Sequence, residues 1–308
     1  MATATPRSQT APAGRAGLWR QSLADYVSLT KPRIILLVLI TTFGAMWMAA
    51  AGPPPLGLTA ATLIAVALAV GGSHTFNMVY DRDIDAVMSR TRSRPLPGGR
   101  ITPAAGLWFS LVQCVLGVLI MWAFAGATAA LLNAAGIFAY TIFYTVWLKR
   151  NTPHNTVLGG VAGAIPPVIG WAAVTHQIAA PALLLFGILF FWQPAHFWAL
   201  VLFQSDDYKA AKLPMVPITN GTAATRRQML IYTGLLYVTS LLLQPLGYAG
   251  WLYEAVACVL GAWFLLSIVK DMRARTDAAY RHLFRVSILY LGLLFLAIAV
   301  DFALFGAR

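Results

Sequence analysis

Three oxygen-bearing side chains, Asn77, Asp81 and Asp85, recur at every fourth position. If a helix continues through them, this spacing places all three on one face. Their amide and carboxylate oxygens suit a hard divalent cation. Mg²⁺ is favoured because it takes few carboxylates and completes its shell with water and phosphate oxygens. Asp83 falls on another face and is not expected to bind metal. The alternative, a solvated loop with balanced charges, is disfavoured by the regular spacing.

Arginines follow this acidic motif on a loop that Pro95 and Pro97 stiffen. These are Arg90, Arg92 and Arg94. A guanidinium group recognises phosphate oxygens through paired, planar hydrogen bonds. Carboxylates that hold Mg²⁺, followed by several arginines, therefore predict a site for a diphosphate.

A second acidic pair, Asp206 and Asp207, ends a later apolar segment and is followed by Lys209. We expect the two acids to bind a second Mg²⁺ or to complete the first site, with Lys209 as a phosphate contact. The alternative is an acidic helix end that Lys209 and Lys212 neutralise. Each interpretation places the pair at the same membrane depth as the first motif.

Tyr144 and Lys149 lie at the end of another apolar segment and are candidates to contact the leaving diphosphate. The alternative is that Lys149 and Arg150 only set the membrane orientation. His196 lies well inside an apolar segment, where an imidazole must be hydrogen-bonded, metal-bound or facing a cavity. A satisfied core histidine and a contact to a metal-containing ring both remain open for His196.

The elements that must position these residues are membrane spans. The chain has 308 residues, of which 59% are hydrophobic and only 10% charged, whereas soluble domains average about a quarter charged residues. A spanning helix needs roughly 20 apolar residues. Nine segments qualify, which predicts an all-α integral membrane protein: 33–51, 56–77, 103–122, 125–147, 156–175, 180–203, 228–246, 249–269 and 284–305.

The basic residues fix the predicted orientation. Of the 22 lysines and arginines, only Arg308 falls on the side opposite to the N-terminus. Such a bias predicts a cytoplasmic N-terminus and a C-terminus on the opposite side. The net charge of +12 is thereby explained without a nucleic-acid partner. Residues 1–20 lack the apolar stretch of a signal peptide, so we expect a disordered cytoplasmic tail there and a single transmembrane domain over 21–308.

The stretch NMVYDRDIDAVMSRTRSRP resembles the first aspartate-rich motif of the UbiA-type intramembrane prenyltransferases. Further segments resemble the branch of that family that farnesylates haem. They are LTKPRIILLVLITTFGAM, TVWLKRNTPHNTVLGGVAGAIPPVIGWAA, PAHFWAL with DDYKAAKLPMVP, and RHLFRVSILYLGLLFLAIAVD. The resemblance extends from about Asp25 to Asp301. In the wider family the second motif reads Asp-x3-Asp, but Ala210 and Ala211 stand at the later positions here, which leaves the ligands of a second metal undefined.

The resemblance implies nine helices around a central cavity, Mg²⁺ as cofactor, farnesyl diphosphate and haem b as substrates, and haem O as product. It implies catalytic roles for Asp81, Asp85 and Lys149. The metal candidates are Asn77, Asp81, Asp85, Asp206 and Asp207. The diphosphate candidates are Arg90, Arg92, Arg94, Tyr144, Lys149 and Lys209. For haem they are His196, Trp192, Trp198 and Arg33, although Arg33 is equally explained by topology.

Two other functions are compatible with parts of this pattern. One is a related prenyltransferase that acts on a quinone precursor or another aromatic acceptor. The other is a transporter, but transporters place ionisable residues near the bilayer midplane, whereas these acids gather at one face. We therefore expect a multi-pass enzyme of the cell membrane, with the lipid bilayer among its partners. Association with haem A synthase or oxidase assembly proteins is left open.

Overall fold

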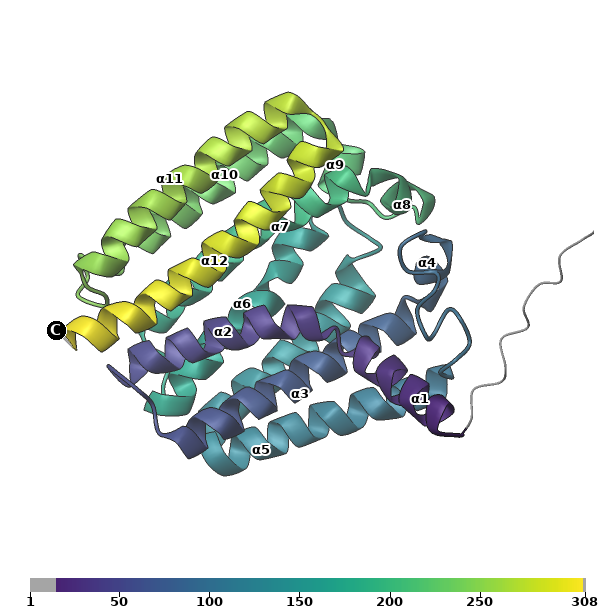
Figure 1. Ribbon diagram of the computed structural model, residues 1–308, viewed down its shortest axis with the longest axis horizontal. Coiled ribbons are helices and arrows are strands. Elements are labelled where there is room, and N and C mark those ends of the chain that lie inside the picture. The colour runs from purple at the N-terminus through teal and green to yellow at the C-terminus, as the bar shows by residue number, and fades with distance from the viewer. Residues whose placement is uncertain (1–14, 307–308) are drawn as a thin grey trace, which may run out of the picture.

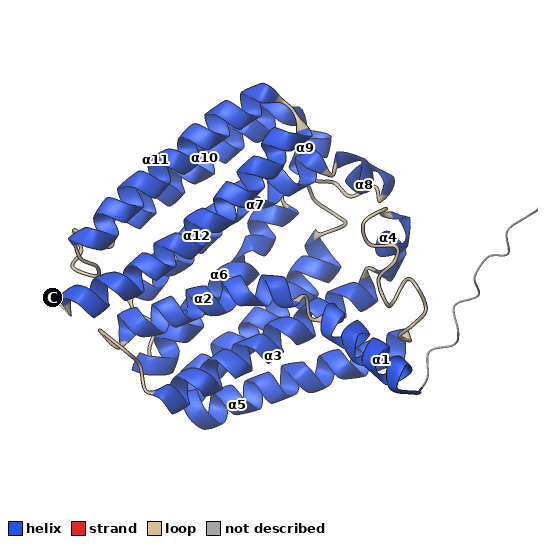
Figure 2. Ribbon diagram, in the orientation of Figure 1, coloured by secondary structure: helices blue, strands red, loops and turns tan. Residues whose placement is uncertain are grey.

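The computed structural model describes residues 15–306, and every regular element within them is a helix (Figures 1 and 2). The first helix, α1, spans Arg15–Leu29. Residues 1–14 lie outside the described residues. The disordered tail expected over 1–20 therefore stays a prediction, as does the single domain over 21–308. The all-α class expected from the sequence is confirmed.

Eight long helices make up the body of the molecule. They are α2 (Pro32–Ala49), α3 (Leu56–Tyr80), α5 (Pro103–Phe138), α6 (Asn155–Thr175), α7 (Ala180–Phe203), α10 (Gly221–Leu241), α11 (Trp251–Ala274) and α12 (Asp277–Phe305). A π-helix, η1 (Ala139–Leu148), continues α5. Short helices α4 (Arg82–Val87), α8 (Ser205–Ala210) and α9 (Val216–Thr219) lie in the connections at one end of the bundle.

Seven helical stretches in the described part of the chain are long and apolar enough to cross a membrane. The third, Pro103–Leu148, contains α5 and η1 and is broken at Gly126, whose φ of 85° and ψ of 177° are not helical. Glycine adopts such a positive φ without steric penalty. Our count of nine treated the two sides of this break as separate spans and also included most of α10. It therefore stays a prediction, while a multi-pass membrane protein is supported.

The long helices pack in a closed circuit, which is crossed where α2 packs on α6 and α7 packs on α12. Each packs on the next in the order α2, α3, α5, α6, α7, α10, α11 and α12, and α12 returns to α2. The backbones of α3 and α5 lie very close together at Gly117. A Cβ added there would lie only 2.8 Å from the carbonyl oxygen of Ala65. Small residues permit this close approach between membrane helices. The circuit brings the ends of α3, η1 and α7 together.

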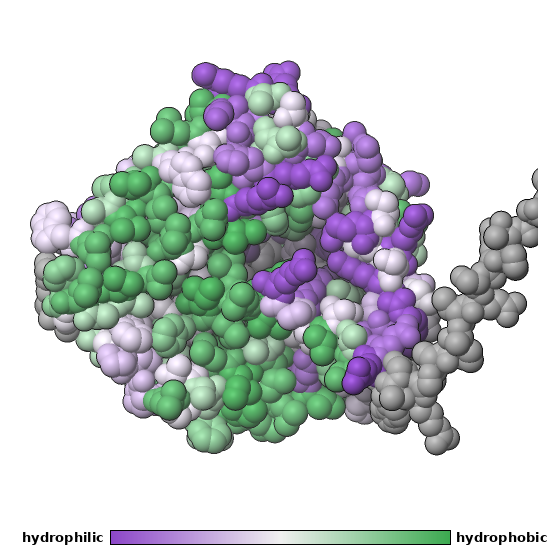
Figure 3. Space-filling view, viewed as in Figure 1, coloured by the Kyte–Doolittle hydropathy of each residue, from purple (hydrophilic) through white to green (hydrophobic). Residues whose placement is uncertain are grey.

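The surface divides into an apolar belt and a polar end (Figure 3). Large apolar side chains such as Trp108, Leu119 and Leu266 are more than half exposed on the flanks of the helices. Apolar patches of this extent mark surface that contacts lipid rather than water. The polar end carries α1, α4 and α8 (Figure 1). On the face shown in Figure 3, the surface is hollowed where the polar end meets the apolar belt.

Candidate active site

The first acidic motif lies where α3 gives way to α4. The helix is not continuous, because Asp81 has φ −90° and ψ 14° between the two elements. The four-residue hydrogen-bond spacing nevertheless persists, since Asp81 N donates to Asn77 O at 2.9 Å and Asp85 N to Asp81 O at 2.8 Å. Asp81 and Asp85 are buried, with 1% and 5% of their surface exposed. The four-residue spacing of the backbone hydrogen bonds thus persists across a break in the helix at Asp81.

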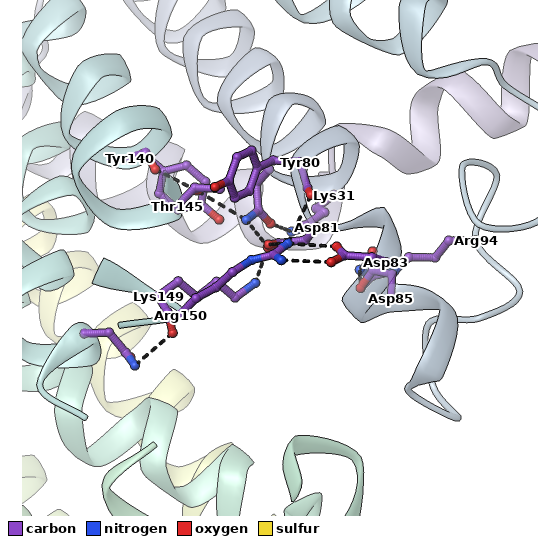
Figure 4. Close-up of polar contacts among 12 residues, drawn as sticks. Lys31, Tyr80, Asp81, Asp83, Asp85, Arg94, Tyr140, Thr145, Lys149 and Arg150 are labelled. Carbon is purple, nitrogen blue, oxygen red and sulfur yellow. Dashed lines mark hydrogen bonds and ion pairs between the residues drawn. The ribbon is translucent and has the colours of Figure 1, made fainter. Parts of the chain in front are cut away.

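Asp81 is the centre of a buried polar cluster (Figure 4). Its Oδ2 accepts a hydrogen bond from Asn77 Nδ2 at 2.7 Å and pairs with Lys149 Nζ. Its Oδ1 lies 3.2 Å from Arg150 Nη2. The Asn77 amide also donates to Thr145 Oγ1 at 3.3 Å. Residues of α3 and of the end of η1, far apart in the sequence, are thereby joined at one carboxylate.

Lys31 reaches the same cluster from the turn between α1 and α2. Its Nζ donates to Asn77 Oδ1 at 3.2 Å. Burial lowers the pKa of Lys31 to about 7, and the positive charges of Arg94 and Lys149 act in the same direction. Lys31, Lys149 and Arg150 therefore converge on Asn77 and Asp81 from two parts of the chain, and this concentration of basic groups suits a multiply charged anion.

Arg150 binds Asp83 through two hydrogen bonds of 2.8 Å, and its guanidinium lies over the ring of Tyr80 at 5.0 Å. These hydrogen bonds hold the pKa of Asp83 at about 2. The Asp83 side chain is 63% exposed. Arg150 also contacts Asp81, so this guanidinium bridges the exposed Asp83 and the buried Asp81.

Asp85 makes a separate ion pair with Arg94. Arg94 Nη1 lies 3.0 and 2.9 Å from the two carboxylate oxygens, and Thr91 Oγ1 holds the Asp85 carbonyl at 2.9 Å. Arg90 and Arg92 are exposed. Of the three arginines in this loop, the structure therefore brings only Arg94 to a buried carboxylate.

The second acidic pair is split between two environments. Asp207 accepts hydrogen bonds from Ser89 N at 2.8 Å, Ser89 Oγ at 2.7 Å and Arg90 N at 3.3 Å. Burial alone raises the pKa of Asp207, but these hydrogen bonds outweigh it and hold the value below its usual range. The Asp206 side chain is 99% exposed and lies 3.8 Å from an exposed Lys209. Asp207 thus ties the two polar loops together, whereas Asp206 and Lys209 lie apart from the first cluster.

The π-helix η1 carries Tyr144 and ends beside Lys149. The Lys149 N–H donates to Tyr144 O at 2.9 Å, five residues back. Single π turns occur often at functional sites. The buried Asn155 amide donates to Thr152 O at 2.7 Å, to Pro214 O at 3.3 Å and to Lys149 O at 3.4 Å. This amide fixes the backbone that presents Lys149.

His196 lies on α7, about 10 Å from the end of the helix at Phe203. Its ring is stacked between Trp192 and Phe284, at centroid distances of 4.2 and 4.6 Å. Its Nδ1 lies 2.7 Å from Ser287 Oγ. The Ser287 hydroxyl donates to Phe284 O at 2.7 Å, so it accepts from Nδ1–H of His196. The lone pair is then on Nε2, which has no hydrogen-bond partner within residues 15–306.

The other two residues expected at haem lie elsewhere. Trp198 is fully buried and meets Tyr232 of α10 edge-on at 6.0 Å. It belongs to the core between α7 and α10 rather than to the His196 side of the helix. Arg33 is exposed near the start of α2.

Lys31, Arg150 and Asn155 contribute to the cluster but were not predicted as site residues. Lys31 and Arg150 stand at the ends of apolar segments, where basic residues are expected on topological grounds alone. Their contacts join positions at least 46 residues apart, so local spacing carries no signal for them. The segment LKRNTPHN, which contains both Lys149 and Asn155, is the one place where the sequence could have indicated a role.

The oxygen donors of the acidic motif can be matched to the ligands that Mg²⁺ prefers. No three His, Cys, Asp or Glu side chains converge among the described residues. Asp81, Asp85 and the Asn77 amide oxygen provide two carboxylates and one neutral ligand. Mg²⁺ is commonly held by one or two carboxylates together with water and substrate phosphates, so these residues fit that ion in the presence of a diphosphate.

Buried acids and several basic side chains at one end of a membrane-embedded helical bundle are the features expected of an intramembrane enzyme that acts on a phosphate ester. The model of the UbiA prenyltransferase family matches residues 38–299. The chain belongs to this family, as the motif resemblance predicted, and is a multi-pass membrane prenyltransferase.

Proteins and structures similar to this chain agree with that assignment. A protoheme IX farnesyltransferase of Symbiobacterium thermophilum is 49% identical over 91% of this chain and 95% of its own length. One of Synechococcus elongatus is 50% identical over 91% of this chain and 88% of its own. A UbiA homologue of Archaeoglobus fulgidus, solved with GPP and Mg²⁺, aligns over 90% of this chain and 99% of its own with a TM-score of 0.65 at 14% identity. That likeness shows the shared fold.

Proposed function

We propose that the chain transfers the farnesyl group of farnesyl diphosphate to a vinyl group of haem b, giving haem O and diphosphate. The observation that carries this proposal is the buried cluster in which Asp81 meets Lys149 and Arg150 while Asp85 meets Arg94. The name shared by relatives at 43–50% identity supports haem as the acceptor over a quinone precursor.

Asp81 and Asp85, with Asn77, are the residues that would hold Mg²⁺. When bound, Mg²⁺ supplies positive charge against the departing diphosphate. The solved family member with GPP and Mg²⁺ supports this cofactor. A second metal at Asp206 and Asp207 has less support, because Asp206 is almost fully exposed.

The basic side chains of the cluster bind and stabilise the diphosphate. Arg94, Lys149 and Arg150 pair with Asp85, Asp81 and Asp83, and Lys31 adds a further positive charge when it is protonated. Fixed positive charge in a partly buried site stabilises negative charge as it develops on a leaving group. Tyr144 is a further candidate contact, whereas Arg90, Arg92 and Lys209 are exposed and are better placed to attract the substrate than to hold it.

In the proposed reaction the bond between C1 of the farnesyl group and the diphosphate oxygen breaks, and its electron pair leaves with diphosphate. The terminal carbon of the haem vinyl group supplies two electrons and forms the new C–C bond to C1. Water adds to the vinyl carbon beside the ring and loses a proton, which leaves a hydroxyl group there. No side chain acts as a nucleophile, so the protein binds, orients and excludes water from the allylic cation.

His196 is proposed to contact haem iron through Nε2. Stacking by Trp192 and Phe284 covers the two faces of the imidazole but leaves its edge open. The hydrogen bond from Nδ1–H to Ser287 fixes the tautomer that a metal ligand requires. Trp192 Nε1 donates to Ser287 O at 2.7 Å and so braces the same pair.

The cell membrane is the proposed location, with the N-terminus in the cytoplasm. The apolar belt and the spanning helices support membrane insertion. The distribution of basic residues, with only Arg308 on the opposite side, supports the orientation. Partners among haem A synthase and oxidase assembly proteins stay a prediction.

The test is an assay resolved by product mass. Membranes containing the protein are incubated with labelled farnesyl diphosphate and haem b, and in parallel with hydroxybenzoate. We expect a product with the mass of haem O that carries the label, and no prenylated hydroxybenzoate. A labelled hydroxybenzoate product without haem O would assign the enzyme to the quinone branch instead.

A further inference from the structure

A second basic pocket, separate from the acidic cluster, lies where α10 begins and α11 ends. It has a volume of about 280 Å³ and is lined by Thr222, Ala223, Arg226, Met272, Arg273 and Arg275. No carboxylate is among these lining residues. Hydrophilic residues gather over this end of α10 and α11, at the top of the view in Figure 3.

The three arginines of this pocket have no acidic partner. Within residues 15–306 none of Arg226, Arg273 and Arg275 takes part in an ion pair, and Arg226 Nε is buried without a hydrogen-bond partner. A buried donor left unpaired is destabilising unless a ligand or water satisfies it. Arg275 adopts a left-handed conformation, with φ 52°. This is the left-handed C-cap of α11, in which the Arg275 N–H donates to Asp271 O at 3.4 Å.

The carboxylates close to this pocket in the sequence are already engaged. Asp271 lies 2.6 Å from His282 Nδ1, and Asp277 lies 3.9 Å from Arg281. The pocket therefore keeps its positive charge. Thr222 adds a hydroxyl donor, and the first turn of the 21-residue helix α10 adds unpaired backbone N–H groups, which favour an anion.

We propose that this pocket binds a phosphate group and that an anionic phospholipid headgroup is its source. Guanidinium groups form paired hydrogen bonds with phosphate oxygens. The pocket lies at the end of α11, which is long and apolar enough to cross a membrane, and beside the start of α10. Basic pockets between helices at a membrane surface bind anionic headgroups. A soluble phosphate has the same chemistry and is the other source that the experiment separates.

The experiment titrates the purified full-length protein in detergent with phosphatidylglycerol or with phosphatidylcholine and counts bound lipid by native mass spectrometry. Arg226→Gln and Arg273→Gln remove pocket guanidiniums, and the second is exposed, so its loss does not disturb the core. Arg227→Gln is the matched control, because Arg227 is adjacent and exposed but does not line the pocket. A parallel arm measures thermal unfolding with inorganic phosphate.

We expect phosphatidylglycerol to bind about tenfold more weakly to Arg226→Gln and Arg273→Gln than to the unmodified chain. The control Arg227→Gln should bind normally, and phosphatidylcholine should not discriminate among the variants. Phosphate that stabilises only the chains with an intact pocket, without binding of phosphatidylglycerol, would support the site and make its ligand soluble. Equal behaviour of Arg226→Gln and Arg227→Gln in both arms would overturn the proposal.

Discussion

The two acidic segments of the chain differ in how they meet positive charge. Asp81 and Asp85 are buried, and each is bound by basic side chains that come from the following loop or from a distant helix. Asp206 is exposed, and its neighbour Asp207 binds the backbone of the other loop. Burial with compensating charge concentrates electrostatic effects, whereas exposed charge is screened. The first segment is therefore expected to serve chemistry and the second to hold the loops.

The largest effect is expected from Asp81→Asn or Asp85→Asn. Each removes one of the two carboxylates offered to Mg²⁺ and leaves a basic side chain without its partner. Haem O formation should fall by about a thousandfold in each variant, while size-exclusion chromatography shows a folded protein. Asp206→Asn is the control and should keep nearly full activity. Full activity of both Asp81→Asn and Asp85→Asn would reverse the comparison between the two segments.

Lys149→Met is expected to have the next largest effect. Lys149 pairs with Asp81 and faces the diphosphate in our account. The rate of farnesyl transfer should fall by about a hundredfold. Lys209→Met removes a lysine that pairs only with exposed Asp206 and should change the rate less than twofold. Steady-state rates with farnesyl diphosphate separate the two, and an equal loss in both would show that charge alone matters.

Two arginines in the loop after α4 provide a matched pair of variants, for which we expect effects of intermediate size. Arg94 binds Asp85, whereas Arg92 is exposed two positions earlier. Arg94→Gln should raise the KM for farnesyl diphosphate about tenfold, and Arg92→Gln should leave it within about twofold. If Arg92→Gln proved the more damaging change, the loop would have to rearrange around the substrate.

The smallest effect is expected from Asp207→Asn. Asp207 accepts three hydrogen bonds from Ser89 and Arg90 and so joins the loops that follow α3 and α7. Its loss should lower the thermal unfolding temperature by a few degrees and the rate about threefold. Ser89→Ala removes one of these hydrogen bonds and should reproduce part of the loss. A thousandfold loss of rate in Asp207→Asn would instead make Asp207 a metal ligand.

Patterns in the sequence predicted those features of the structure that depend on residues close together in the chain. The spacing of Asn77, Asp81 and Asp85 follows from helical periodicity and persists across the end of α3. The break at Gly126 lies close to the boundary predicted between the segments 103–122 and 125–147. The contact between the two polar loops agrees with the prediction that the two acidic motifs lie at the same membrane depth.

The rest of the site depends on contacts that the sequence does not encode locally. Lys31 and Arg150 look like ordinary topogenic charges, and only the packing of α2, α3 and η1 brings them to Asn77 and Asp81. The π-helical form of η1 cannot be read from AYTIFYTVWL, because its residues suit an α-helix equally well. Asp206 and Asp207 are adjacent in the sequence, but opposite directions at the start of α8 separate their environments.

The central claim is that the buried carboxylates hold the metal through which farnesyl diphosphate is bound. Calorimetric titration of the purified protein with farnesyl diphosphate, in Mg²⁺ and in excess chelator, tests it most directly. We predict binding at least about tenfold tighter with Mg²⁺ and no such difference in Asp81→Asn. Equally tight binding with and without Mg²⁺ in the unmodified chain would contradict the account.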